Sequence, residues 1–180
     1  MPKVPLIPEQ PDNPEVRALF DEVLSNWPAV PNLYRALGNS PDMLRTWLDF
    51  AWPLRTKATT SRRLRELMIL RGARVSRTGY EWAHHVPMAL AAGVTRDEVD
   101  ALLQDRMADS FSPAENAALR LAEEVTTGPA ASDACMEALK LHYSDAEIVE
   151  LVLTAGFYVC VGRVLTSLQV PLEEKFEAPW

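Results

Sequence analysis

The segment SRTGYEWAHHVPMALAAG, residues 76–93, indicates the fold class and holds most of the candidate chemistry. Its apolar residues recur at helical spacing, which predicts an amphipathic core helix. Those expected to face the interior are Trp82, Ala89 and Ala92. Glu81 and His85 are four residues apart, so they lie on one face, about one turn from each other, whereas His84 leans to the other side. The segment therefore predicts a carboxyl and an imidazole close together and partly removed from water.

Such an environment favours acid–base chemistry. Burial raises the pKa of a carboxyl and lowers the pKa of an imidazole, which moves both toward neutrality, where proton transfer is most effective. A solvated surface pair is the alternative, and such pairs contribute only about a few tenths of a kcal/mol. Pro87 removes the usual partner of the Ala83 carbonyl and predicts a kink that opens a cavity beside His85.

A second helix is predicted after the polar residues 59–61 and runs to about residue 75. Glu66 shares its apolar side, where an unpaired charge is costly. We therefore expect Glu66 to have a buried partner, and His85 is the candidate. An ion pair with Arg71 or Arg74, or a solvated charge, is the alternative.

The other segments also have helical signals. The proline-rich opening predicts an extended arm, because proline fixes φ and lacks a hydrogen-bond donor. The further helices are expected over residues 14 to about 26, 30–38, 41–53, 95 to about 102, 113–127, 132–141 and 144–167. Since no strand pattern has comparable strength, the prediction is an all-α protein. We divide it into an arm (1–12), a helical domain (13–170) and a tail (171–180).

The composition limits the function classes. A chain of 180 residues with 48% apolar content is sufficient for one domain with its own core. Its net charge of −7, with acids and bases interspersed, disfavours nucleic acid as a partner. The start lacks the features of a signal peptide, and the apolar run 151–162 is too short for a bilayer span, so we expect a cytoplasmic protein without a membrane partner. Cys135 and Cys160 have apolar neighbours, which predicts buried thiols rather than a disulfide.

These residues also carry a family resemblance. Arg65-Glu66-Leu67, then Tyr80-Glu81-Trp82 and His85, then Ala89 and Gly93 resemble the carboxymuconolactone decarboxylase family, which shares its fold with alkylhydroperoxidase D. The resemblance implies a single-domain helical bundle that packs as a trimer or as a dimer of trimers, with pockets near the interfaces. It also implies a small-molecule substrate and no cofactor.

The peroxidase branch of that family has a glutamate, a Cys-x-x-Cys pair with a histidine between the cysteines, and a second histidine four residues later. In this sequence Glu66 takes the place of the glutamate, Thr78 and Glu81 those of the cysteines, and Tyr80 and His85 those of the histidines. Both thiols are therefore absent, and the peroxidase cycle requires them. The resemblance implies instead the acid–base chemistry of the branch without thiols, which decarboxylates a lactone acid and shifts its double bond.

From this resemblance we interpret His85, Glu81 and Glu66 as the catalytic residues. His85 would take or deliver the proton at the reacting carbon, Glu81 would orient the imidazole or exchange a proton with it, and Glu66 would fix its tautomer. Tyr80 could stabilise an enolate oxygen. The expected reaction is proton transfer on a small or medium carboxylate, lactone or enolisable carbonyl compound, by a lyase or an isomerase.

Five residues are candidates for substrate binding. They are Tyr80, Trp82, His84, Arg71 and Arg163. An anionic substrate needs a local cation in a protein of negative net charge, which is the reason for the two arginines. As alternatives, Tyr80 and Trp82 are core residues, His84 lies at an interface, and the arginines are solvated.

Two other functions stay open. The chain could be an oligomeric binding protein that kept the fold without catalysis. A metal ion on Glu66, Glu81 and His85 is a third hypothesis, because carboxylates with an imidazole suit iron, zinc or manganese.

Overall fold

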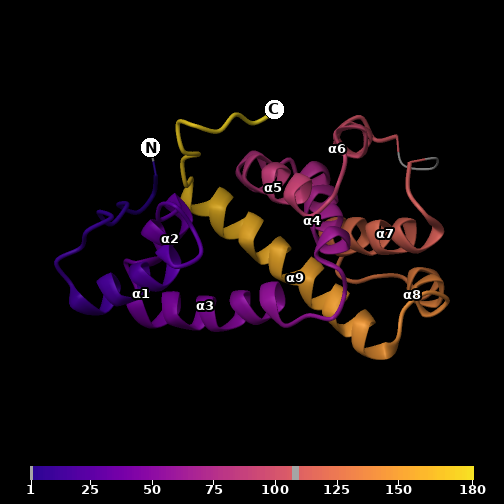
Figure 1. The fold of residues 1–180 in the computed structure, drawn as a ribbon, viewed down its shortest axis with the longest axis horizontal. Helices are drawn as coiled ribbons and strands as arrows, with labels where there is room; N and C mark the ends of the chain where they lie inside the picture. Colours follow the sequence, from indigo (N-terminus) through magenta and orange to yellow (C-terminus); the bar gives the residue numbers. More distant parts are fainter. Residues whose placement is uncertain (1, 107–109) are drawn as a thin grey trace.

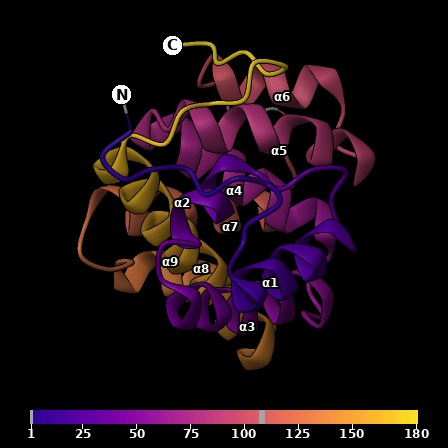
Figure 2. The same cartoon turned by 90° about the vertical axis from the view of Figure 1, so that its left-hand side faces the viewer.

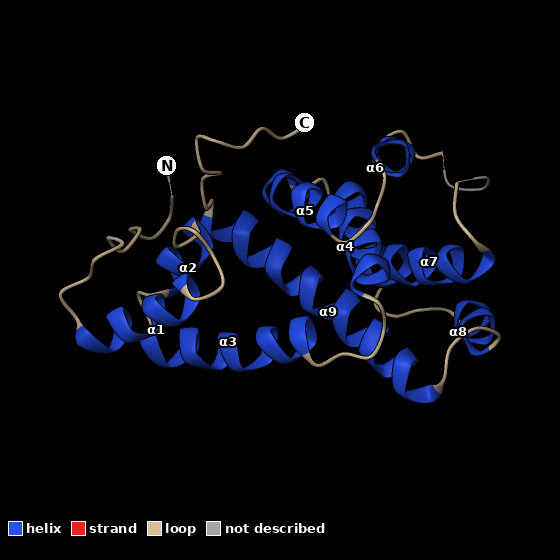
Figure 3. Cartoon of the chain, viewed as in Figure 1, coloured by secondary structure: helices blue, strands red, loops and turns tan. Residues whose placement is uncertain are grey.

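The computed structural model describes residues 2–106 and 110–180, and all regular structure in these residues is helical (Figure 3). The helices are α1 (Pro14–Leu24), α2 (Asn32–Leu37), α3 (Pro41–Thr56), α4 (Arg62–Ser76), α5 (Gly79–Ala91), α6 (Arg96–Leu103), α7 (Pro113–Thr127), α8 (Asp133–Lys140) and α9 (Asp145–Leu168). The predicted all-α fold is confirmed.

Helix α9 runs diagonally through the molecule and contacts α3, α4, α7 and α8 (Figure 1). It begins with a capping box, in which the Ser144 and Glu147 side chains bind each other's backbone N–H groups. In the described part of the chain it is the one helix long and apolar enough to cross a bilayer. Its contacts with four other helices are those of a core helix.

The N-terminal helices α1, α2 and α3 form a layer with an apolar cluster of their own, which includes Phe20, Leu44 and Leu48. The arm before α1 lies against this layer, because the Ile7 backbone N–H donates to the Arg35 carbonyl. The two chain ends lie on the same side of the molecule (Figures 1 and 2).

One helix end differs from its prediction in a way that matters for the site. Helix α3 continues through Pro53 and ends at Thr56, whereas the sequence predicted that it stops at Pro53. The reason is that a proline forfeits only its own hydrogen bond and leaves those of the following residues possible. The extra turn carries Arg55 toward α4 and α5.

The prediction of two buried thiols is half wrong. Cys135 is buried in the cluster between α4, α7, α8 and α9, but Cys160 is exposed. Helix α9 is apolar nearly all round, yet its neighbours cover only part of its circumference. Residues on the uncovered side, including Val149 and Leu153, therefore face outward.

Candidate active site

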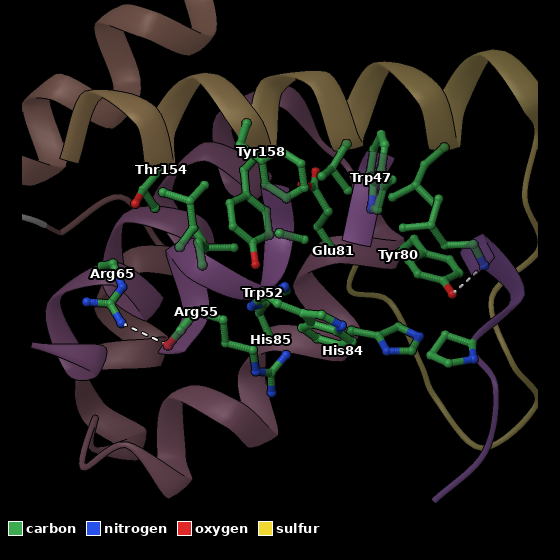
Figure 4. Close-up of a pocket in the computed structure, with 18 of the residues that line it drawn as sticks. Trp47, Trp52, Arg55, Arg65, Tyr80, Glu81, His84, His85, Thr154 and Tyr158 are labelled. Carbon is green, nitrogen blue, oxygen red and sulfur yellow. Dashed lines mark hydrogen bonds between the residues drawn. The ribbon is translucent and has the colours of Figure 1, made fainter. Parts of the chain in front are cut away.

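A cavity, here called cavity 1, lies between the N-terminal layer and helices α4, α5 and α9 (Figure 4). The space inside it is about 760 Å³ when the open solvent at its mouth is included. Its walls are mainly aromatic, from Trp27, Tyr34, Trp47, Trp52, Tyr80, Phe157 and Tyr158. Glu81, His84 and His85 of α5 also line it, so a ligand here would meet aromatic faces and a few ionisable groups.

The expected contact between Glu66 and His85 is confirmed. Nδ1 of His85 lies 2.7 Å from Oε2 of Glu66. The Glu66 side chain is fully buried, and His85 is 7% exposed with its ring edge-on to Tyr158, 4.9 Å between centroids. Because a carboxylate only accepts hydrogen bonds, Nδ1 carries the proton in this pair. Nε2, which has no protein partner among the described residues, is left as a base.

The partner of Glu66 on its own helix is Arg62, not Arg71 or Arg74. Burial alone would raise the pKa of Glu66, but its interaction with His85, which includes the Nδ1 hydrogen bond, and the charges of Arg62 and Arg55 lower that pKa. Burial lowers the pKa of His85 against the opposing effect of Glu66. The pair is therefore an ionised carboxylate and a neutral imidazole at neutral pH.

Glu81 differs from the expectation, because its carboxyl does not bind His85 in the described structure. It reaches α9 instead, where Gly162 leaves room for its Oε2 atom and for the neighbouring Thr78 hydroxyl. Its Oε1 atom is buried and has no hydrogen-bond partner. Burial raises the pKa of Glu81 to about 8, against the opposing hydrogen bond from Thr78. Glu81 therefore stays protonated at neutral pH and can donate a proton.

Three arginines line cavity 1, and their partners distinguish them. Arg62 pairs with Glu66, and Arg65 donates to the backbone carbonyls of Thr60 and Arg55. The Arg55 guanidinium lies over the Trp27 ring, 4.8 Å from its centroid, and has no carboxylate partner among the described residues. Burial lowers the pKa of Arg55, as expected for a buried cation whose charge neighbouring acids do not fully balance. Arg55 is therefore the cation that can receive an anionic ligand.

Tyr80 and His84 meet a residue of the tail. His84 Nε2 lies 2.6 Å from Oε2 of Glu173, and the Tyr80 hydroxyl donates to Oε1 at 2.8 Å. The backbone N–H of Asn32 donates to the same Oε1 atom at 2.7 Å. The rings of Tyr80 and His84 stack at 4.4 Å. Glu173 thus fixes one wall of cavity 1 by joining the tail to α2 and α5.

Three residues expected to bind substrate lie outside cavity 1. Trp82 packs in the core against Trp180, with ring centroids 5.4 Å apart. Arg71 pairs with Asp105 and Glu123, so acids of its own chain neutralise it. Neither residue lines cavity 1. Arg163 lines a second cavity, described below, and not cavity 1.

A shared metal ion is not supported by the geometry. Across residues 2–106 and 110–180, no three His, Cys, Asp or Glu side chains come close enough to form a metal site. The Glu81 carboxyl points to α9, whereas Glu66 holds His85 from α4. The three groups of the metal hypothesis therefore do not converge.

One family model matches part of the chain. Residues 41–124 match the model of the carboxymuconolactone decarboxylase family. This segment covers slightly less than half of the chain. It includes α3 to α6 and most of α7, and so contains Glu66, Glu81 and His85. No curated protein matches the chain.

Solved structures have the same fold as this chain over most of its length. A peroxidase-related protein from Ralstonia eutropha JMP134, with an alkylhydroperoxidase AhpD core, has a TM-score of 0.83 at 18% identity, covering 97% of this chain and 93% of its own. A peroxidase-related protein from Silicibacter sp. TM1040 has a TM-score of 0.83 at 17% identity, with 97% and 94% covered. A complex of the debrominase Bmp8 with 2,3,4-tribromopyrrole has a TM-score of 0.79 at 20% identity, with 91% and 88% covered.

Sequence reasoning missed several residues of this candidate site. Arg55 follows Pro53, where the helix was expected to end. Tyr158 lies on α9, where Thr154, Tyr158 and Gly162 follow one another at four-residue spacing in an otherwise apolar helix. That polar and small-residue stripe was a usable signal. No pattern in the sequence indicated Glu173, because its partners Asn32, Tyr80 and His84 are far away from it in the chain.

Proposed function

We propose that this chain is a proton-transfer enzyme, a lyase or isomerase that acts in cavity 1 on a small or medium carboxylate, lactone or enolisable carbonyl compound. One observation carries the proposal. A neutral imidazole held by Glu66 and a protonated carboxyl, Glu81, line the same cavity. Two groups whose pKa values are moved in opposite directions are typical of a base and an acid in one site.

The proposed steps use these groups separately. In an isomerisation, Nε2 of His85 removes a proton next to a carbonyl group, and the electron pair of that C–H bond forms an enolate. Glu81 then protonates a different carbon, and His85 returns its proton to solvent. In a decarboxylation, loss of CO₂ leaves the electron pair on the enolate, and Glu81 supplies the proton that replaces the carboxylate. Glu66 acts by holding the imidazole with its proton on Nδ1.

The walls of cavity 1 favour a flat substrate with an anionic group. Aromatic side chains contact planar rings well, and the desolvated Arg55 guanidinium would bind a carboxylate. The similar debrominase fold holds tribromopyrrole, which is also a small flat ring. Thiol chemistry is not proposed, because neither Cys135 nor Cys160 lines cavity 1.

The test is solvent-proton exchange. The protein is incubated in D₂O with phenylpyruvate, unsaturated lactone acids and aromatic carboxylates, and proton NMR follows deuterium incorporation and CO₂ loss. We expect turnover with at least one class, reduced about 100-fold or more in His85→Ala and Glu81→Gln. The control is His142→Ala, an exposed histidine outside cavity 1. Equal turnover in all four proteins would overturn the proposal.

The pH profile gives a further signature. Activity of the wild type should decrease as pH rises through about 8, because Glu81 loses its proton there. An oligomeric binding protein would behave differently. Its ligands would raise the melting temperature, without turnover, and would do so in His85→Ala as well.

We also infer that the chain self-associates through the uncovered side of α9. Val149, Val152 and Leu153 are exposed there, and Phe50 of α3 is exposed as well. Exposed apolar patches of this kind often mark interfaces. Light scattering of the wild type against Leu153→Glu tests this, with a smaller assembly expected for the variant and an unchanged mass contradicting the inference.

A further inference from the structure

A second cavity, here called cavity 2, lies on the far side of Glu81 between α4, α5, α7 and α9. Glu81, Thr154, Tyr158 and Ile69 line both cavities, so Glu81 forms part of the wall between them. The lining of cavity 2 has more serine and threonine hydroxyls than that of cavity 1, in which Thr154 is the one such residue among the described walls. Those of cavity 2 belong to Ser76, Thr78, Thr126, Thr154 and Thr166.

Two of the hydroxyls connect Glu81 to the surface. The Glu81 carboxyl and the Thr78 hydroxyl lie side by side next to Gly162, and Thr78 Oγ1 lies 2.8 Å from Ser76 Oγ. Glu81 is 3% exposed and Thr78 is 7% exposed, whereas Ser76 is exposed. The Thr78 side chain makes no cap bond at the start of α5. The three groups therefore form a chain of polar groups that leads from solvent to a buried acid.

Gly162 of α9 keeps this chain open. A Cβ atom at Gly162 would lie 2.8 Å from Glu81 Oε2 and 3.1 Å from Thr78 Oγ1. The first distance is shorter than side chains tolerate, so any larger residue would push the carboxyl or the hydroxyl away. The backbone of α9 thus comes close to the chain without filling its space.

We propose that cavity 2 is a proton inlet, in which the hydroxyls of Ser76 and Thr78 pass protons from solvent water to Glu81 while a substrate occupies cavity 1. This inference rests on the proposed function, in which Glu81 donates a proton to carbon. A substrate that fills cavity 1 would stand between Glu81 and the mouth of that cavity. The inlet therefore explains how Glu81 recovers its proton in each cycle.

The proton balance is simple. Glu81 loses one proton to the substrate carbon and becomes a carboxylate. The Thr78 hydroxyl then donates its proton to Glu81, takes one from Ser76, and Ser76 takes one from water. Each hydroxyl rotates and both donates and accepts, so the chain returns to its first state. One solvent proton enters for each proton delivered to carbon.

The test observes Glu81 without a substrate. Infrared difference spectra identify the carbonyl band of the protonated Glu81 carboxyl as the band missing in Glu81→Gln. The pH is then jumped from 9.5 to 6, and the return of this band is timed. We expect the return to be about tenfold slower or more in Thr78→Val and in Ser76→Ala than in the wild type. Thr78→Ser, which keeps a hydroxyl, should restore the rate.

The matched control is Thr126→Val, which removes a hydroxyl from the wall of cavity 2 that bonds to the Ala122 carbonyl instead of to Glu81. His84, His85, Tyr158 and Arg163 also lie on the two walls, and subtraction of the Glu81→Gln spectra removes their contributions. Gly162→Ala should slow the return as Thr78→Val does.

The inlet is overturned if the band returns equally fast in Thr78→Val and in the wild type, or if Thr126→Val slows it as much. Either result would leave the proposed function intact, because that depends on the turnover of His85→Ala and Glu81→Gln. Conversely, a slow return in Thr78→Val without any turnover would support the inlet and overturn the enzyme.

Discussion

Nδ1 of His85 lies 2.7 Å from the Glu66 carboxylate, across the contact between α5 and α4. The two residues are 19 positions apart in the chain. Their contact turns a buried histidine into an oriented base, because it fixes the proton on Nδ1 and leaves Nε2 free of protein partners in the described structure.

Replacing Glu66 should cost stability and activity together. In Glu66→Gln, the Arg62 charge loses its partner, and the imidazole loses the carboxylate that fixes its tautomer. We expect the free energy of unfolding in urea to fall by about 1–3 kcal/mol, and turnover to fall by about 10-fold or more. The control is Glu137→Gln, whose ion pair with Lys140 is exposed to solvent and should contribute little to stability. Equal losses in the two variants would contradict the role of Glu66.

Glu81 predicts a specific pH dependence of stability. Its pKa is about 8 in the folded chain and has an ordinary value of 4.5. Between these values the folded state binds more protons than the unfolded state, so stability falls as pH rises. Urea unfolding of the wild type relative to Glu81→Gln should show a loss of roughly 3–5 kcal/mol from pH 4.5 to pH 8. If the stability of the two proteins changed with pH in the same way from pH 4.5 to pH 8, Glu81 would already be ionised in the folded chain.

Arg55 should bind anions in cavity 1. Benzoate is a suitable probe, because it combines a flat ring with a carboxylate. We expect Arg55→Met to weaken benzoate binding by about 10- to 100-fold in calorimetry, since a hydrogen bond to a charged group contributes about 1.5–3 kcal/mol. Arg106→Met, at an exposed arginine outside the cavity, is the control. Unchanged affinity in Arg55→Met would place the anion elsewhere.

The tail should detach when Glu173 is neutralised. Burial alone would raise the pKa of Glu173, but hydrogen bonds from His84, the Asn32 backbone and Tyr80 lower it to about 2. Its contribution is therefore complete above the ordinary value of 4.5 and is lost as pH falls toward 2.

Hydrogen exchange measures this effect. At pH 7, amides of residues 171–180 should exchange faster in Glu173→Gln than in the wild type, because the amide cannot replace the carboxylate as acceptor for all three donors. Glu174→Gln is the neighbouring control. Protection that is equal in the wild type and Glu173→Gln would show that apolar contacts such as Trp82–Trp180 hold the tail alone.

The sequence predicted the helices well because their starting signals are local. Ser112 and Ser144 cap their helices through their own side chains, as expected from the residues that follow them. It also predicted that Glu66 needs a buried partner, since an unpaired charge on the apolar face of a helix is costly.

Relations between distant helices were harder to predict. Helical spacing placed Glu81 next to His85, but the Glu81 side chain turns toward Gly162 of α9. The spacing of residues within one helix says nothing about a neighbour on another helix. Arg71 and Arg55 were also indistinguishable as cations in the sequence. The fold distinguishes them, because Asp105 and Glu123 neutralise Arg71, whereas Arg55 has no carboxylate partner among the described residues.

The central claim is that His85 is a neutral base with its proton on Nδ1. Long-range proton–nitrogen NMR of the side chains tests it most directly, because the chain has only three histidines and His85→Ala assigns the signal. At pH 7 we expect a neutral His85 ring, protonated at Nδ1, that becomes an imidazolium only below the ordinary histidine pKa. An imidazolium at pH 7, or a proton on Nε2, would contradict it.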